Sequence, residues 1–257
     1  MIKITYLGTC SGTEPMPGMH HCALTMEIGG AVYWFDAGET CAYTGYLAGI
    51  DMTAIRTVVI SHPHMDHIGG MANLLSCIRK LNSRYKLPLK NDNTLRVFTP
   101  DHTVFDAILT VLCSNTAHKL PYTLIEEEVH DGLLYEDENV RISAIHNAHL
   151  NEDGSKGWRS YSFLIEAEGK RIVYSGDVKK SEELDPFVSG GCDLLIHETG
   201  HHPVADVCAY AESRGVKQLR FNHHGREIIG GREAAEELTR QYACPALLCY
   251  DGMTEEI

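Results

Sequence analysis

The stretch Val58-Val59-Ile60-Ser61-His62-Pro63-His64-Met65-Asp66-His67-Ile68-Gly69-Gly70 is the most informative part of this sequence. Its first residues are apolar and mostly β-branched, which is typical of a buried strand. The proline favours an extended conformation at the residue before it, so the side chains of His62 and His64 should point the same way. Asp66 and His67 follow where a helix is expected to begin. Three imidazoles and a carboxylate would therefore gather at the end of one strand.

This cluster predicts a metal site, because ionisable side chains crowded at a strand end are costly without a cation. The alternative is a polar loop in which the imidazoles bond to one another. Imidazole and carboxylate ligands suit Zn²⁺ best, and Mn²⁺ or Fe where oxygen ligands are abundant. The pattern offers ligands to two adjacent ions, but one loop cannot complete both coordination shells. Further ligands are expected at later strand ends.

Three later segments supply such candidates. They are His146 and His149, which follow a strand-like run; Asp177, in Ser-Gly-Asp after the next run; and His223 with His224, after a late run. Taken alone, each has an ordinary interpretation, since Gly-Asp is common in turns and single histidines are often merely hydrogen-bonded. The first cluster makes metal ligation the better interpretation for them.

The remaining pattern predicts an α/β fold in which helices cover mixed sheets, because strand-like runs alternate with helical ones. Strands are expected over Ile2–Leu7, Cys22–Ile28, Ala31–Asp36, Thr57–Ser61, Leu95–Thr99, Val140–Ile145, Tyr161–Glu166, Arg171–Ser175, Leu194–His197, Gln218–Asn222 and Ala246–Tyr250. Helices are expected over Gly70–Leu81, Val104–Cys113, Val204–Arg214 and Arg232–Tyr242. The sequence contains no repeat and no Pro/Gly/Ser-rich linker, so residues 1–257 are expected to form a single domain.

Composition excludes several classes of protein. The chain has 22 Lys+Arg against 35 Asp+Glu, a net charge of −13, which disfavours binding along extended nucleic acids. No apolar run approaches the roughly 20 residues of a membrane span, and the first residues do not resemble a signal peptide. The 9 Cys are scattered without a CxxC pair, so no disulfide framework is indicated. These features favour a cytoplasmic protein that does not bind membranes.

The histidine motif and the later candidates resemble the metal motifs of the metallo-β-lactamase superfamily. Within it, the chain is most similar to the ribonuclease Z-like branch over nearly its whole length. Four shorter motifs support this in order: Leu7–Pro15, Phe35–Glu39, Asp193–Thr199 and Tyr250–Met253. The resemblance implies a four-layer αβ/βα sandwich with a dinuclear metal site. Dimers are common in this branch, so a homodimer is one option.

Position by position, the resemblance implies two ligand sets and a bridge: His62, His64 and His149 for one ion, Asp66, His67 and His223 for the other, and Asp177 shared. His146 and His224 are alternatives to their neighbours, although supporting hydrogen bonds suit them better. Two such ions lower the pKa of a bridging water toward about 7, and Asp66 could orient the resulting hydroxide. The resemblance also suggests that His197, supported by Glu198, contacts the phosphate or protonates the leaving oxygen. The alternative for His197 is a core histidine.

The chain departs from ribonuclease Z in one respect. That enzyme holds tRNA with a long basic arm before the strand that leads to its bridging Asp. Here Tyr161–Asp177 passes instead through a short Glu-Gly-Lys hairpin. Together with the acidic charge, this favours a metal-dependent phosphodiesterase for a small molecule, such as a cyclic nucleotide. The alternatives are a carboxyl-ester, lactone or thioester hydrolase, and a non-catalytic metal-binding accessory protein.

Overall fold

The computed structural model describes residues 1–14, 16–113, 119–150, 153–155 and 157–257. The chain forms two compact units. Unit 1 comprises Met1–Gly8, Pro15–Val129 and Asp251–Ile257, and unit 2 comprises Thr9–Glu14 and His130–Tyr250. Each unit contains one seven-stranded sheet.

The sheet of unit 1 has the strand order β14-β1-β2-β3-β4-β5-β6. Its strands are β1 (Ile2–Gly8), β2 (Ala23–Ile28), β3 (Ala31–Phe35), β4 (Ile55–Val59), β5 (Thr94–Thr99), β6 (Thr123–Glu128) and β14 (Thr254–Glu256). The helices of this unit are α1 (Cys41–Leu47), η1 (Met52–Ala54), α2 (Met65–Ile68), α3 (Met71–Tyr85) and α4 (His102–Cys113). Strands β3 to β6 run parallel, so their carboxyl ends lie at one edge of the sheet.

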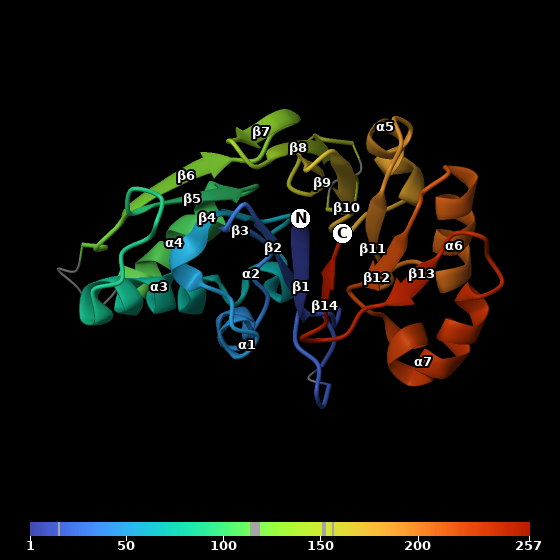
Figure 1. Cartoon of the computed structure of the whole chain (residues 1–257), viewed down its shortest axis with the longest axis horizontal. Coiled ribbons are helices and arrows are strands. Elements are labelled where there is room, and N and C mark those ends of the chain that lie inside the picture. The colour runs from blue at the N-terminus through green and yellow to red at the C-terminus, as the bar shows by residue number, and fades with distance from the viewer. Residues whose placement is uncertain (15, 114–118, 151–152, 156) are drawn as a thin grey trace. The chain divides into compact units, whose positions relative to one another are not determined.

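Helix α3 covers this sheet because its apolar residues recur at helical spacing. Met71, Leu74, Leu75 and Ile78 are buried in one core cluster with residues of β3, β4 and β5. Figure 1 shows α3 and α4 together on one side of these strands. The helix thereby fixes the segment just before it, which carries the histidine motif.

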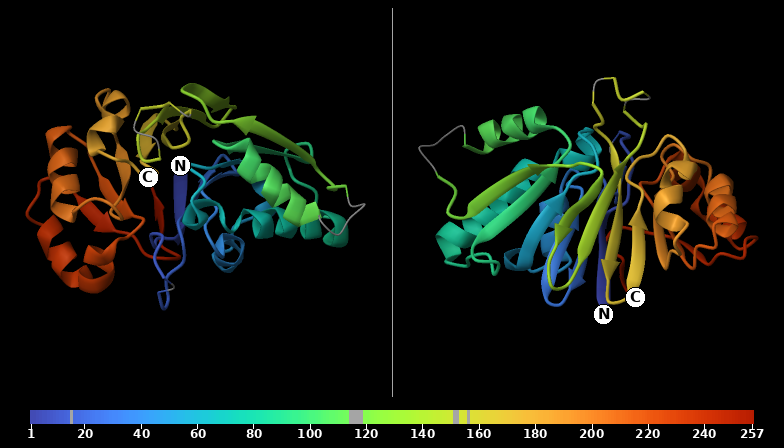
Figure 2. Two further views of the ribbon diagram at one scale, coloured as in Figure 1. Left: turned by 180° about the vertical axis from the view of Figure 1, so that it is seen from behind. Right: turned by 90° about the horizontal axis from the view of Figure 1, so that it is seen from above.

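The sheet of unit 2 has the order β13-β12-β11-β10-β9-β8-β7. Its strands are β7 (Gly132–Glu136), β8 (Arg141–His146), β9 (Tyr161–Ala167), β10 (Lys170–Tyr174), β11 (Leu194–Glu198), β12 (Leu219–Asn222) and β13 (Ala246–Leu248). Its helices are η2 (Ser181–Leu184), α5 (Asp185–Val188), α6 (Val204–Ser213) and α7 (Arg226–Thr239). Figure 2 shows α6 and α7 packed together beside the late strands. Strands β10 to β13 run parallel, and β8 shares their direction because β9 is antiparallel to both neighbours.

The α/β fold class is confirmed, with differences at element ends. Helix α3 extends to Tyr85, a full turn beyond the predicted end, and stops where Lys86 adopts a left-handed conformation. Helix α7 begins at Arg226 rather than Arg232, because the chain continues as helix across a kink at Gly231. Strands β6, β7 and β14 are absent from the predicted set, since β6 and β14 are rich in acidic residues, β14 has only three residues, and β7 has no buried residue.

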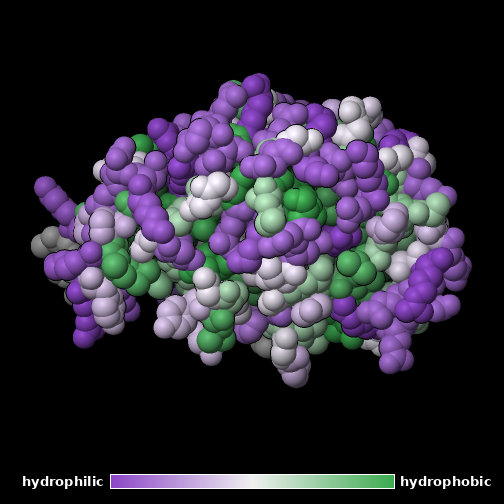
Figure 3. Space-filling view, in the orientation of Figure 1, coloured by the Kyte–Doolittle hydropathy of each residue, from purple (hydrophilic) through white to green (hydrophobic). Residues whose placement is uncertain are grey.

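The surface is largely polar. The face drawn in Figure 3 is mostly hydrophilic, with separate hydrophobic patches. Within the described part of the chain, no helix combines the length and apolar character needed to cross a membrane.

Candidate metal centre

In unit 1, the site is built around Asp36, the first residue after β3. Its backbone has a φ of 55°, a left-handed conformation that is uncommon for a residue other than glycine. Its fully buried carboxylate accepts hydrogen bonds from the backbone N and Oγ of Ser61, at 2.7 and 2.9 Å. It also accepts one from Nδ1 of His67 at 2.8 Å. Asp36 therefore ties the ends of β3 and β4 to helix α2.

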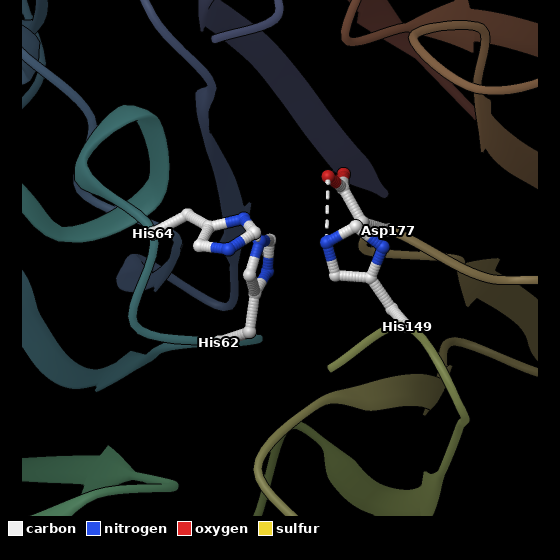
Figure 4. A group of neighbouring side chains, drawn as sticks. All are labelled: His62, His64, His149 and Asp177. Atoms are coloured by element: carbon white, nitrogen blue, oxygen red, sulfur yellow. Dashed lines mark hydrogen bonds and ion pairs between the residues drawn. The ribbon is translucent and has the colours of Figure 1, made fainter. Parts of the chain in front are cut away.

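These bonds determine which nitrogens the histidines present. The Ser61 hydroxyl donates to Asp36, so it accepts from Nδ1 of His62 at 3.0 Å. His62 and His67 thus both use Nδ1 inside the protein and present Nε2 as a ligand atom. Nε2 of His62 lies 3.0 Å from Nδ1 of His64, and Figure 4 shows the two rings side by side, their planes inclined by 74°. The predicted convergence of His62 and His64 is observed.

Asp66 completes this half of the site. Its carboxylate Oδ2 lies 3.4 Å from Nε2 of His67, and both side chains are buried. Close packing holds the loop in place, because a Cβ on Gly38 would lie 2.3 Å from the backbone oxygen of Asp66. Only glycine at position 38 lets the turn after β3, which carries Asp36, contact the segment that carries Asp66 and His67.

In unit 2, Asp177 lies between two histidines. It follows β10, His223 follows β12, and His149 follows β8, so all three lie at the carboxyl edge of the sheet. One carboxylate oxygen, Oδ2, is 3.6 Å from Nε2 of His149, the contact drawn in Figure 4. The other, Oδ1, is 3.4 Å from Nδ1 of His223. A carboxylate that presents one oxygen to each histidine has the arrangement expected of a bridging ligand.

Two histidines that the sequence interpretation did not select lie beside this group. His201 and His202 follow Glu198 by three and four residues, and that spacing was the available signal. The Glu198 carboxylate accepts hydrogen bonds from the backbone N of His201 at 2.8 Å and from its Nδ1 at 3.1 Å. Burial alone would raise the pKa of Glu198, but the hydrogen bonds from His201 and the nearby imidazole of His223 hold it below its ordinary value. The same bond to Glu198 raises the pKa of His201.

His197 has different contacts from those expected of a proton donor to substrate. Its side chain is fully buried, its Nδ1 donates to the backbone oxygen of Glu198 at 2.7 Å, and its Nε2 is 3.0 Å from Oγ of Ser181. Both ring nitrogens are therefore used within the protein. The geometry makes His197 a positioning residue that holds the segment after Asp177 against β11.

The burial of His197 predicts a pH dependence of stability. Burial lowers its pKa from 6.5 to about 4 in the folded protein. Between these values the unfolded chain binds more protons, so the free energy of unfolding falls as the pH falls, by about 1.4 kcal/mol per pH unit. We expect His197→Gln to remove this contribution, as measured by urea unfolding of chelator-treated protein from pH 6.5 to pH 4. An unchanged slope would contradict the assigned burial of a neutral ring.

His146 and His224, the two alternative ligands, make their hydrogen bonds to groups other than Asp177. Nδ1 of His146 bonds to the Asp131 carboxylate at 2.7 Å, and its ring stacks on Trp158 with centroids 4.0 Å apart. Nε2 of His224 donates to the backbone oxygen of Cys249 at 2.8 Å, and burial lowers its pKa to about 4. Both residues support the fold, whereas His149 and His223 face Asp177.

Comparisons with known proteins agree with this picture. A family model described as Anti-Pycsar protein Apyc1 matches residues 2–213. The ribonuclease Z of Picrophilus torridus is 26% identical over 86% of this chain and 85% of its own. The short form of human tRNase Z has a TM-score of 0.75 at 21% identity, covering 99% of both chains. The metallo-β-lactamase fold protein YhfI from Bacillus subtilis has a TM-score of 0.76 at 18% identity, covering 100% and 99%.

Fold and comparisons together define a metal-dependent hydrolase of the metallo-β-lactamase fold, similar to ribonuclease Z. His/Asp clusters in both units are suited to binding metal. Within this class, the chain belongs to the Anti-Pycsar protein Apyc1 family.

Proposed function

We propose that the protein is a dinuclear metal-dependent phosphodiesterase that hydrolyses a small phosphodiester, such as a cyclic nucleotide. The observation that carries this proposal is the connection between β9 and β10. Ala167 and Lys170 pair directly, so the two strands are joined only by Glu168 and Gly169, whose φ is 73°. A two-residue turn offers no arm to hold tRNA, which separates this chain from the ribonuclease Z proteins that it resembles.

The donor set in each unit fits divalent ions. Unit 1 supplies imidazole nitrogens from His62, His64 and His67 with the Asp66 carboxylate, and unit 2 supplies His149, His223 and Asp177. The nitrogen atoms of two imidazole ligands of a tetrahedral Zn²⁺ lie about 3.3 Å apart. The distance between Nε2 of His62 and Nδ1 of His64 is 3.0 Å, which is close to this value. The resemblance supports the division of ligands given above, with Asp177 shared. Zn²⁺ is the favoured ion.

Bound ions of this kind lower the pKa of coordinated water and neutralise charge on phosphoryl oxygens. Side chains of the protein itself hold the metal-binding imidazole rings in a fixed orientation. Asp36 keeps the His67 ring fixed through Nδ1, and Ser61 does the same for His62. In this proposal Asp66, buried beside His67, orients the attacking water while it remains a ligand.

An activity panel on one metal-analysed preparation tests this proposal. We expect bound zinc and faster hydrolysis of cyclic nucleotides and bis(p-nitrophenyl) phosphate than of lactones or thioesters. We also expect little trimming of a tRNA precursor. Preferential lactone or thioester hydrolysis would reassign the chemistry, and efficient tRNA trimming would overturn the argument from the hairpin. A fully metallated protein inert on every substrate would favour the non-catalytic accessory role.

A further inference from the structure

One carboxylate in unit 2 joins the segment that follows β8 to the segment that follows β10. Oε1 of Glu183 accepts a hydrogen bond from the backbone N of Ala148 at 2.9 Å. Oε2 of Glu183 accepts hydrogen bonds from the backbone N of Lys179 at 2.9 Å and from that of Lys180 at 3.1 Å. Each oxygen of the carboxylate therefore binds the backbone of a different segment.

Each of these two segments carries a proposed metal ligand. Ala148 directly precedes His149, and Lys179 follows Asp177 by two residues. Nε2 of His149 lies 3.6 Å from Oδ2 of Asp177, as Figure 4 shows. The bonds to Glu183 thus fix the backbone close to both ligands, and the distance between the ligands depends on how the two segments are held together.

A local role in its own turn explains only part of this arrangement. Glu183 is the third residue of η2, and its bond from the backbone N of Lys180 is the contact expected of a glutamate in a capping box. That contact uses Oε2 alone. The bond to Oε1 comes from Ala148, which lies 35 positions away in the chain and belongs to a different segment.

The segment after β8 is also held by a second side chain. Asn147 is buried, its Oδ1 accepts from the backbone N of His149 at 3.1 Å, and its Nδ2 donates to Oγ of Ser162 at 3.1 Å. The consecutive backbone N–H groups of Ala148 and His149 therefore both donate to side chains. The backbone that carries the His149 ring is positioned by Asn147 and Glu183 together.

We propose that Glu183 is a positioning residue that sets the separation of His149 and Asp177 for metal binding. The proposal rests on the metal centre of the function proposed above and extends it, because Glu183 acts through the backbone of the two segments rather than as a ligand. A carboxylate offers an acceptor oxygen to each segment, whereas the amide of glutamine offers only one. Whichever way that amide turned, its NH₂ group would face a backbone N–H, and one segment would be released.

The zinc affinity of the full chain tests this role. It would be measured by competition with a chromophoric chelator for wild type, Glu183→Gln, Glu183→Asp and Glu182→Gln. We expect each Glu183 variant to weaken binding of one ion about 10-fold or more, as is typical when a residue that orients ligands is removed. Aspartate keeps the charge but is one methylene too short to reach both segments. The neighbouring Glu182 is exposed, so Glu182→Gln should bind zinc like the wild type.

A double variant separates positioning from a general loss of stability. The separation of two ligands matters only while both are present, so Glu183→Gln should lower zinc affinity by less than about 2-fold when it is added to His149→Ala. Equal losses in the presence and absence of His149 would overturn the proposal, as would an equal loss in Glu182→Gln. Wild-type affinity in Glu183→Asp would also overturn it, and this variant decides the question if Glu183→Gln does not fold.

Activity of the wild type is recorded separately. A protein that binds zinc with the expected dependence on Glu183 but hydrolyses no phosphodiester would contradict the proposed function and support this role of Glu183. A wild-type protein that hydrolyses phosphodiesters, together with Glu183 variants of unchanged zinc affinity, would support the proposed function and contradict the positioning role.

Discussion

Asp177→Asn is expected to lower kcat/KM for phosphodiester hydrolysis by about 10⁴-fold and to reduce bound zinc. The Asp177 carboxylate contacts His149 through one oxygen and His223 through the other, so it lies where a shared ligand is needed. Asparagine keeps the shape of the side chain but removes its charge. Because removal of a group that acts as part of a catalytic unit costs most of the rate, the expected loss is large.

The matched control is Asp193→Asn in the same unit. Asp193 lies just before β11, where it bonds to Nζ of Lys217 at 2.8 Å and to the backbone N of Arg171 at 2.9 Å. We expect this variant to keep wild-type zinc content and an activity within about 2-fold. If Asp177→Asn retained both zinc and activity, the assignment of Asp177 as a shared ligand would be wrong.

Gly200→Ala is expected to lower activity about 100-fold without removing any ligand. A Cβ at this position would lie 2.6 Å from both Cε1 and Nδ1 of His223 and 3.3 Å from Cβ of Ser11. The His223 ring would have to leave its present position beside Asp177, and a displacement of about 1 Å at a catalytic centre can cost about 10²-fold in rate. Zinc affinity and kcat/KM measured on the same preparation check this expectation.

Gly230→Ala is the control for this substitution. Gly230 lies in α7, and among the described residues beyond its own helix backbone no heavy atom lies within 4 Å of the position that its Cβ would take. We expect wild-type activity and zinc binding from this variant. Equal losses in the two variants would show that the effect of Gly200→Ala does not act through His223.

Much of the fold could be predicted because apolar periodicity is a local property. The buried residues of α3 recur at helical spacing, and the β-branched run of β4 leads directly into the histidine motif. Strand β6 was missed because its last residues are Glu126, Glu127 and Glu128 at the edge of the sheet, where charged side chains are tolerated. Such a strand is defined by its neighbour rather than by its own hydrophobicity.

The candidate site was predictable where its residues follow one another closely in the chain. His62 and His64 could be placed on one side by their spacing alone, and the structure places them so. The contact between Glu198 and His223 could not be anticipated, since the two residues meet only after β11 and β12 pair. The burial of His197 likewise depends on Ser181, which reaches it from a separate turn.

The Asp36 carboxylate has a further consequence for how the protein acquires its metal. Zinc fingers fold around their ion, because nothing else orders the ligands. In unit 1, Ser61, His62 and His67 are already linked to Asp36 by hydrogen bonds on a buried sheet edge. The entropy of arranging these rings is therefore lost when the chain folds rather than when metal arrives. The rings are thus oriented by the protein's own hydrogen bonds, so the fold itself prepares the centre for the reactivity that a metal would supply.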